Sequence, residues 1–232
     1  STGYANIAIG HSALKNNTSR YNIAVGGMNM WGAGGHSGCC NTASGAYALV
    51  ANISGSHNTA TGALALKSNN TGCYNTGTGF CALAKNTTAV GNTAHGSNAL
   101  CANTTGAYNT ASGYAASRAN TTGLGNTSTG YGALSSTSTG GCNTAFGAFA
   151  ASLCHLINGG ITAVGYAAAE NTCASSIVAV GYKALNTNTT GGENIAVGSY
   201  ALEFNSTHAR NTAIGTSALR CSCAADNTAV GY

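Results

Sequence analysis

The sequence contains no proline, and charged residues make up only 5% of its 232 positions, where a soluble domain carries roughly 25%. Eight Lys and Arg stand against four Asp and Glu. So sparse a set of charges excludes the basic patch that nucleic acid or an anionic membrane surface would require. It also leaves few acids and bases for catalysis. We therefore expect no enzyme, no catalytic residue and no cofactor.

Long apolar runs are missing as well. Apolar residues reach 44%, but Gly and polar residues interrupt every run, and none approaches the roughly 20 residues that span a bilayer. No segment resembles a cleavable signal peptide. The low charge, the missing proline and the abundant Val, Ile and Thr argue against disorder. Glycine shows no three-residue period, which excludes collagen. A repetitive β-structure remains.

A pentad of the type N-T-A-V-G recurs along the whole chain with a mean spacing of 17 residues. We number the columns of each repeat from the first pentad residue, column 0. The fourteen pentads begin at Asn6, Asn22, Asn41, Asn58, Asn75, Asn92, Asn109, Asn126, Asn143, Ile161, Ile177, Asn194, Asn211 and Asn227. The chain is therefore read as one continuous array over residues 1–232, without an internal domain boundary.

Column 4 is glycine in every repeat: Gly10, Gly26, Gly45, Gly62, Gly79, Gly96, Gly113, Gly130, Gly147, Gly165, Gly181, Gly198, Gly215 and Gly231. Columns 1 and 3 hold β-branched or small polar residues, which predicts one face of a strand. Columns 2 and 4 hold Ala and Gly, so we expect close backbone approach on the other face, where a change such as Gly113→Val would clash. Ala in column 7 and Leu in column 8 predict a second short strand.

One 17-residue unit cannot bury a core, but stacked units can, since each strand pairs with its copies above and below. The predicted fold is all-β, a parallel β-solenoid or β-roll of fourteen 17-residue coils. Neither end carries an atypical capping repeat. We therefore expect a window on a longer fibre, or molecules that stack end to end.

The pentads N-I-A-I-G at Asn6, N-I-A-V-G at Asn22 and N-T-A-I-G at Asn211, followed by S-A-L or Y-A-L, resemble head repeats of trimeric autotransporter adhesins. They are also similar to the N-T-A-x-G-Y-x-A-L repeats of phage and viral tail-fibre proteins. The resemblance covers the whole chain. It implies a homotrimeric fibre with small residues near the three-fold axis, located outside the cell or on the cell or virion surface. The 17-residue unit and the ten cysteines depart from the autotransporter pattern.

The ten cysteines form no C-x-x-C pair, and the six histidines share no ligand spacing, so we expect no metal site. Stacked columns lie about 5 Å apart, which is within disulfide reach. Cys154 and Cys173 fall in adjacent repeats and are the predicted inter-coil disulfide. The alternative is that the cysteines serve as small buried hydrophobic residues.

Column 11 carries Asn in eight repeats, each within an N-x-S/T sequence. These residues are Asn17, Asn52, Asn69, Asn86, Asn103, Asn120, Asn188 and Asn205. Because the column falls in a turn, we expect it at the surface, where it would form a line of N-glycans in a glycosylating pathway. The alternative is a turn that simply favours Asn and Thr.

We hypothesise a structural rod of an extracellular or virion-surface fibre that spaces or presents an adhesive or receptor-binding tip, with copies of itself as partners. One alternative is an adhesin whose own sides bind cell-surface glycans or a host receptor. In such an adhesin the aromatic residues of column 5 would stack on sugars; the other interpretation is that they brace the turn. They are Phe80, Tyr114, Tyr131, Tyr166 and Tyr182. Another alternative to the structural rod is a secreted filament that assembles from copies of this chain.

An ice-binding solenoid is a further alternative, suggested by the T-x-T pairs Thr59/Thr61, Thr76/Thr78 and Thr127/Thr129.

The least regular stretch of the sequence is residues 27–40, which hold a two-residue insertion with Met28, Met30 and Trp31. This stretch is either a subunit contact or a locally repacked coil.

Overall fold

The computed structural model describes residues 3–30, 35–153 and 159–232. The chain divides into two compact units, Ser1–Ala115 and Ala116–Tyr232, here called unit 1 and unit 2. Regular structure among the described residues consists of β-strands. In that part of the chain, no helix is long and apolar enough to cross a membrane.

Each repeat contributes one short strand at columns 1 to 3 of the pentad. Unit 1 contains β1 (Ile7–Ile9), β2 (Ile23–Val25), β3 (Thr42–Ser44), β4 (Thr59–Thr61), β5 (Thr76–Thr78), β6 (Thr93–His95) and β7 (Thr110–Ser112). Unit 2 contains β8 (Thr127–Thr129), β9 (Thr144–Phe146), β10 (Ile161–Val164), β11 (Ile177–Val180), β12 (Ile195–Val197), β13 (Thr212–Ile214) and β14 (Thr228–Val230).

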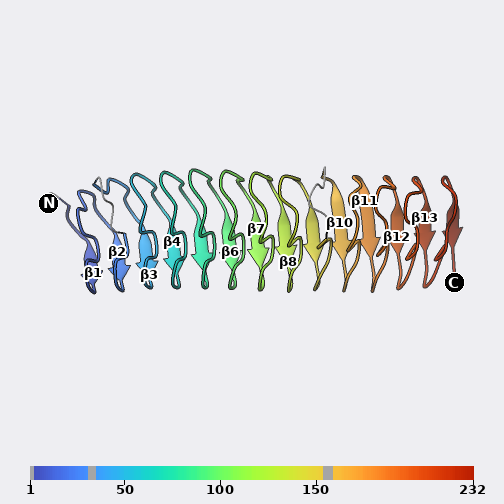
Figure 1. Ribbon diagram of the computed structural model, residues 1–232, viewed down its shortest axis with the longest axis horizontal. Helices are drawn as coiled ribbons and strands as arrows, with labels where there is room; N and C mark the ends of the chain where they lie inside the picture. The colour runs from blue at the N-terminus through green and yellow to red at the C-terminus, as the bar shows by residue number, and fades with distance from the viewer. Residues whose placement is uncertain (1–2, 31–34, 154–158) are drawn as a thin grey trace. The chain divides into compact units, whose positions relative to one another are not determined.

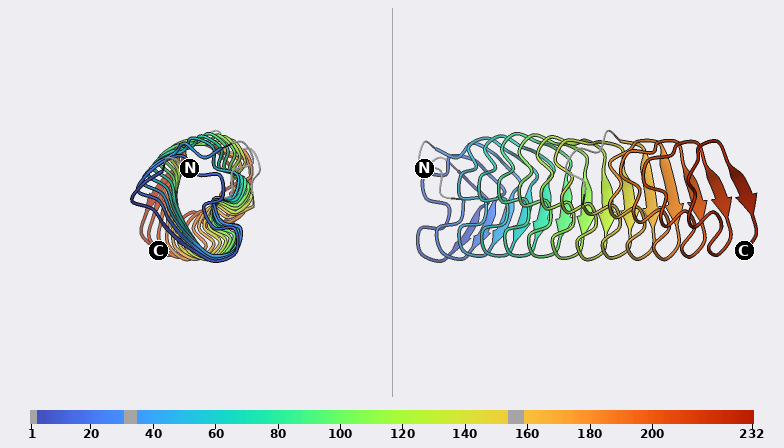
Figure 2. Two further views of the ribbon diagram at one scale, coloured as in Figure 1. Left: turned by 90° about the vertical axis from the view of Figure 1, so that its left-hand side faces the viewer. Right: turned by 45° about the vertical axis from the view of Figure 1, so that its right-hand side comes forward.

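Within each unit the strands pair in parallel with their neighbours in chain order, and equal columns lie opposite one another (Figure 1). The end-on view of Figure 2 shows that each coil encloses an interior and that the next coil of its unit lies behind it. The predicted all-β parallel β-solenoid with 17-residue coils is confirmed. At about 4.8 Å per coil, the seven strands of one unit extend over roughly 29 Å.

The middle residue of each strand points inward and its two neighbours point outward. Ala43, Ala60 and Ala94 at column 2 have no exposed surface, whereas no residue at column 1 or 3 of β3 to β7 is buried. Leu66, Leu83 and Leu100 of column 8 complete the apolar part of the interior and are fully buried. The strand alternation read from the pentad therefore separates core from surface.

The second strand predicted at columns 7 and 8 is wrong, because this stretch forms a turn in the described coils. The column 8 leucines adopt left-handed backbone conformations, for example Leu66 with a φ of 51° and Leu83 with a φ of 53°. A strand requires negative φ values, so these residues do not form one, although their N–H groups still bond to the next coil, as Leu66 N does to Ala82 O at 2.9 Å. The turn directs each Leu side chain into the interior instead.

Column 4 glycine forms the corner that follows each strand. In all fourteen repeats its φ lies between 125° and 138°, a region that residues with a Cβ rarely adopt. A Cβ at Gly79 would lie 2.6 Å from the carbonyl carbon and oxygen of Gly96 in the next coil. The column therefore combines a backbone requirement with close approach between coils.

Unit 2 tolerates matched exceptions to the repeat. Ser117 takes the place of the column 8 Leu and Ser128 that of the column 2 Ala, and the two buried hydroxyls are 2.8 Å apart in a hydrogen bond. Ile161 and Ile177 replace the column 0 Asn, are both buried, and lengthen β10 and β11 to four residues. Each departure is satisfied within the interior that it alters.

His36 occupies an interior position in the coil that carries the two-residue insertion. It is fully buried, and its Nε2 accepts a hydrogen bond from Asn52 Nδ2 at 2.9 Å, which requires a neutral ring at that nitrogen. Burial lowers the pKa of His36 below its ordinary value of 6.5. Met30 is also fully buried in the same coil, which favours a locally repacked coil. Trp31 lies outside the described residues.

We expect Gly79→Val to destabilise unit 1 by more than about 4 kcal/mol or to prevent folding, because the side chain meets backbone at a strained φ. Gly27→Ala is the control, since a Cβ there meets nothing within 4 Å, and should change stability by less than about 1 kcal/mol. Urea denaturation of both variants checks this. Equal unfolding midpoints would contradict the close approach between coils.

We expect stability to fall as the pH decreases through about 6.5, because the unfolded chain then binds a proton that buried His36 resists. The contribution of neutral His36 to the free energy of unfolding is fully present above that pH. It is lost progressively as the pH falls towards the lower pKa that His36 has in the folded state. His36→Asn should flatten this dependence, whereas His11→Asn, at an exposed site, should not. Thermal melts between pH 5 and pH 8 provide the measurement; identical profiles for wild type and His36→Asn would contradict the assignment.

Candidate functional site

The outward strand face of unit 1 carries a regular array of hydroxyl groups over β3 to β7. Nine of its ten positions at columns 1 and 3 are Thr or Ser, and the tenth is His95. We call these residues the hydroxyl row: Thr42, Ser44, Thr59, Thr61, Thr76, Thr78, Thr93, His95, Thr110 and Ser112. Their spacing is about 4.8 Å between coils and about 6.6 Å along a strand.

The outward strand face of unit 2 is apolar over β10 to β14. Seven of its ten positions at columns 1 and 3 are Val or Ile, and the other three are Thr. We call these residues the apolar row: Thr162, Val164, Val178, Val180, Ile195, Val197, Thr212, Ile214, Thr228 and Val230. None of them is buried, and Val230 is 76% exposed.

Charge is absent from both rows. None of the fourteen described strands contains Lys, Arg, Asp or Glu. The small-residue face, which the resemblance places near a three-fold axis, is the interior of the single chain, because the column 2 alanines of β2 to β13 are buried. A partner can therefore reach the strand residues of columns 1 and 3, but not the Ala column.

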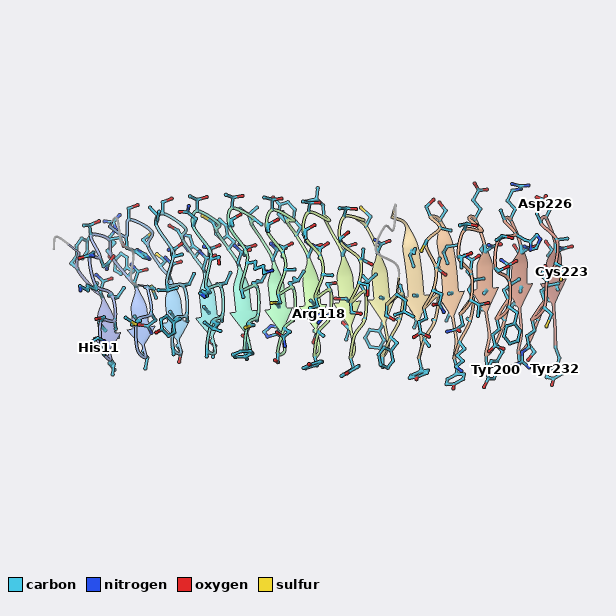
Figure 3. The ribbon with its side chains drawn as sticks, in the orientation of Figure 1. His11, Arg118, Tyr200, Cys223, Asp226 and Tyr232 are labelled. Atoms are coloured by element: carbon cyan, nitrogen blue, oxygen red, sulfur yellow. The ribbon has the colours of Figure 1, made fainter. Side chains whose placement is uncertain are left out.

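A ladder of aromatic rings follows the turns of unit 2. Tyr166 and Tyr182 stack with their ring centroids 5.4 Å apart, and Tyr182 meets Tyr200 edge-on at 5.3 Å. Tyr131 and Phe149 pair edge-on in the same way. Tyr200, whose other neighbour is the Arg220 guanidinium at 4.9 Å, lies at the opposite edge of the unit from Asp226 (Figure 3). These contacts between rings of successive coils brace the turns, while Tyr131, Tyr166 and Tyr182 remain 44–53% exposed.

The prediction that column 11 Asn lies at the surface is wrong. All eight residues are buried, with at most 5% exposure: Asn17, Asn52, Asn69, Asn86, Asn103, Asn120, Asn188 and Asn205. The amide nitrogen that would carry a glycan is a hydrogen-bond donor inside the coil. Asn69 Nδ2, for example, donates to Asn52 Oδ1 at 3.1 Å and to Gly72 O at 2.9 Å.

Column 0 forms a second internal asparagine ladder, which the sequence reading missed. Asn58 donates from its backbone N–H and from Nδ2 to Asn41 Oδ1, at 2.9 and 3.1 Å. Its Nδ2 also donates to Gly72 O at 2.8 Å, the same carbonyl that Asn69 reaches. The signal that could have found both ladders was the recurrence of Asn at two columns of a stacked repeat.

Among the described residues, eight cysteines are thiols rather than members of a disulfide: Cys39, Cys40, Cys73, Cys81, Cys101, Cys142, Cys221 and Cys223. Cys173 is not one of them. Its predicted partner Cys154 lies outside the described residues. The Cys154–Cys173 disulfide stays a prediction.

No family model, no curated protein and no solved structure matches this chain.

We expect Asn69→Ala to destabilise the fold by about 1–3 kcal/mol, because Asn86 Nδ2 loses its acceptor at Asn69 Oδ1 inside the interior. Asn70→Ala alters the adjacent, exposed residue and should change stability by less than about 0.5 kcal/mol. Urea midpoints measure both effects. Equal values would show that the buried ladder carries no net stability.

Proposed function

We propose that the chain is a structural module of a fibre that assembles with copies of itself through the apolar row. The observation that carries the proposal is the five-coil band of Val and Ile on the outer face of β10 to β14, which has no charged residue in its strands. Removing the exposed part of one of these Val or Ile side chains from water contributes at most about 1 kcal/mol. Such a band therefore supports association when two copies cover it.

A regular solenoid suits this role because its stability comes from contacts between neighbouring coils rather than from a central globular core. The resemblance to adhesin heads and tail-fibre repeats supports the same role. It also supports placement outside the cell or on a virion surface, and a passive rather than enzymatic function. The aromatic ladder of unit 2, being engaged with itself, adds weight to a structural role over direct glycan binding.

The test compares two double variants that change the same columns in successive coils. Ile195→Asp with Ile214→Asp places charge on the apolar row, and Thr59→Asp with Thr78→Asp does so on the hydroxyl row. We expect the wild-type chain and the hydroxyl-row variant to self-associate in sedimentation experiments. The apolar-row variant should weaken association at least tenfold, because association would then bury a charge. A wild-type chain that stays monomeric, or equal effects of both variants, would contradict the proposal.

A second candidate function, ice binding, is favoured by the hydroxyl row. Its nine Thr and Ser side chains on successive parallel strands make a two-dimensional array of hydroxyl and methyl groups. Such an array can order water in register with a crystal lattice. The charge-free strands leave no strongly hydrated ion to disturb that order.

The same two double variants separate this candidate from fibre assembly. If the hydroxyl row binds ice, the wild-type chain shows thermal hysteresis. That activity is lost in the Thr59→Asp, Thr78→Asp variant and is kept in the Ile195→Asp, Ile214→Asp variant. No freezing-point hysteresis at any protein concentration would exclude the candidate.

A further inference from the structure

Three side chains that favour soft metals meet at the turns that precede β3 and β4. Cys39 and Cys40 come before β3, and His57 comes before β4. Their two Sγ atoms and a ring nitrogen all lie within 4.8 Å of one another. Among the described residues this is the one grouping of three or more His, Cys, Asp or Glu side chains that could share a cation.

The stacking of the coils brings these residues together. Cys40 and His57 each stand immediately before a pentad, and both have left-handed backbones, with φ values of 60° and 59°. The backbone N–H of His57 donates to Cys39 O at 3.1 Å, and the backbone N–H of Cys39 donates to Ser56 Oγ at 3.1 Å. Two neighbouring coils are thus tied to each other at the point where the three side chains meet.

The imidazole is held in place by the next coil. Tyr74 stacks on His57 with the ring centroids 5.0 Å apart and the planes 1° from parallel. Stacking restricts rotation of the imidazole but leaves the ring edge, which carries the nitrogens, free to face a ligand. The two sulfurs come from adjacent residues of one turn and lie within 4.8 Å of each other.

The cluster is open to solvent. None of its three residues is buried, and Cys39 lines a surface pocket of about 370 Å³ together with Tyr4, Ser19 and Arg20. A small ion can therefore reach the sulfurs without opening the solenoid.

We propose that Cys39, Cys40 and His57 form a site for a soft divalent transition metal, with Zn²⁺ as the best fit. Two thiolates and one imidazole are a donor set that zinc uses when a fourth position stays open for water or another ligand. Zinc–sulfur bonds of about 2.3 Å and zinc–nitrogen bonds of about 2.0 Å place tetrahedral ligands roughly 3.5–3.8 Å apart. From separations of at most 4.8 Å, the ligand atoms need to approach one another by no more than about 1.3 Å to reach that geometry.

The bound ion would join the turns that precede β3 and β4, because Cys39 and Cys40 belong to the first and His57 to the second. Metal binding releases the thiol protons to solvent, so the bound site carries two thiolates on one divalent ion. The site is independent of the apolar row, which lies on unit 2.

The experiment uses the full chain, reduced and stripped of metal, and titrates it with Co²⁺ and Zn²⁺. We expect Co²⁺ to produce thiolate-to-metal charge-transfer absorption, Zn²⁺ to displace it, and one equivalent of Zn²⁺ to stay bound through gel filtration. Cys39→Ser, Cys40→Ser and His57→Asn should each lose that equivalent. His57→Cys should keep it, because it replaces one soft donor with another.

The matched control is the double variant Cys221→Ser, Cys223→Ser, which removes two neighbouring exposed thiols from unit 2. It should retain the bound equivalent and the cobalt spectrum. Circular dichroism confirms that each variant is folded before it is titrated. Zinc retention that is unchanged in the three ligand variants, or that is lost only in the control, would overturn the proposal, as would cobalt binding without a thiolate band.

Discussion

The fold depends on how asparagine amides are satisfied inside the coil. In the central coils of unit 1, two Asn side chains, from columns 0 and 11, donate to the same turn carbonyl: Asn58 and Asn69 to Gly72, and Asn41 and Asn52 to Gly55. Each amide oxygen accepts from the Asn one coil further on. Because an unpaired amide in this interior would cost several kcal/mol, the ladders fix the register of these central coils against their neighbours.

The 17-residue period and the strand alternation were sufficient to predict a parallel solenoid, its strand positions and the inward-facing alanines. The turns could not be read in the same way. Leu66 in a left-handed conformation is disfavoured by local propensity and is stabilised by burial, a tertiary effect. Asn in an N-T-T-G stretch suggests an exposed turn, but stacking provides the partners that bury it. Cys39, Cys40 and His57 show no ligand spacing in the sequence, because their proximity depends on one full coil of intervening chain.

The columns that face inward are constrained by stacking, whereas the outward columns are free to diverge. Column 2 stays Ala, Gly or Ser, while columns 1 and 3 change from hydroxyl to aliphatic between β3–β7 and β10–β14. The Cys39–Cys40–His57 cluster likewise lies in an outer turn column. A single scaffold can therefore present chemically different surfaces along its coils without altering its core.

The repeat length has a genetic consequence. Steps of 16, 18 and 19 residues occur between pentads, yet the paired strands keep equal columns opposite one another, so small insertions and deletions are absorbed in the turns. Recombination between repeats that share these columns could duplicate or delete a whole 17-residue segment. In the regular coils, each ladder would then continue into a neighbour of the same kind. Chain length can thus drift in whole coils, and the number of coils becomes a trait that selection can adjust independently of the fold.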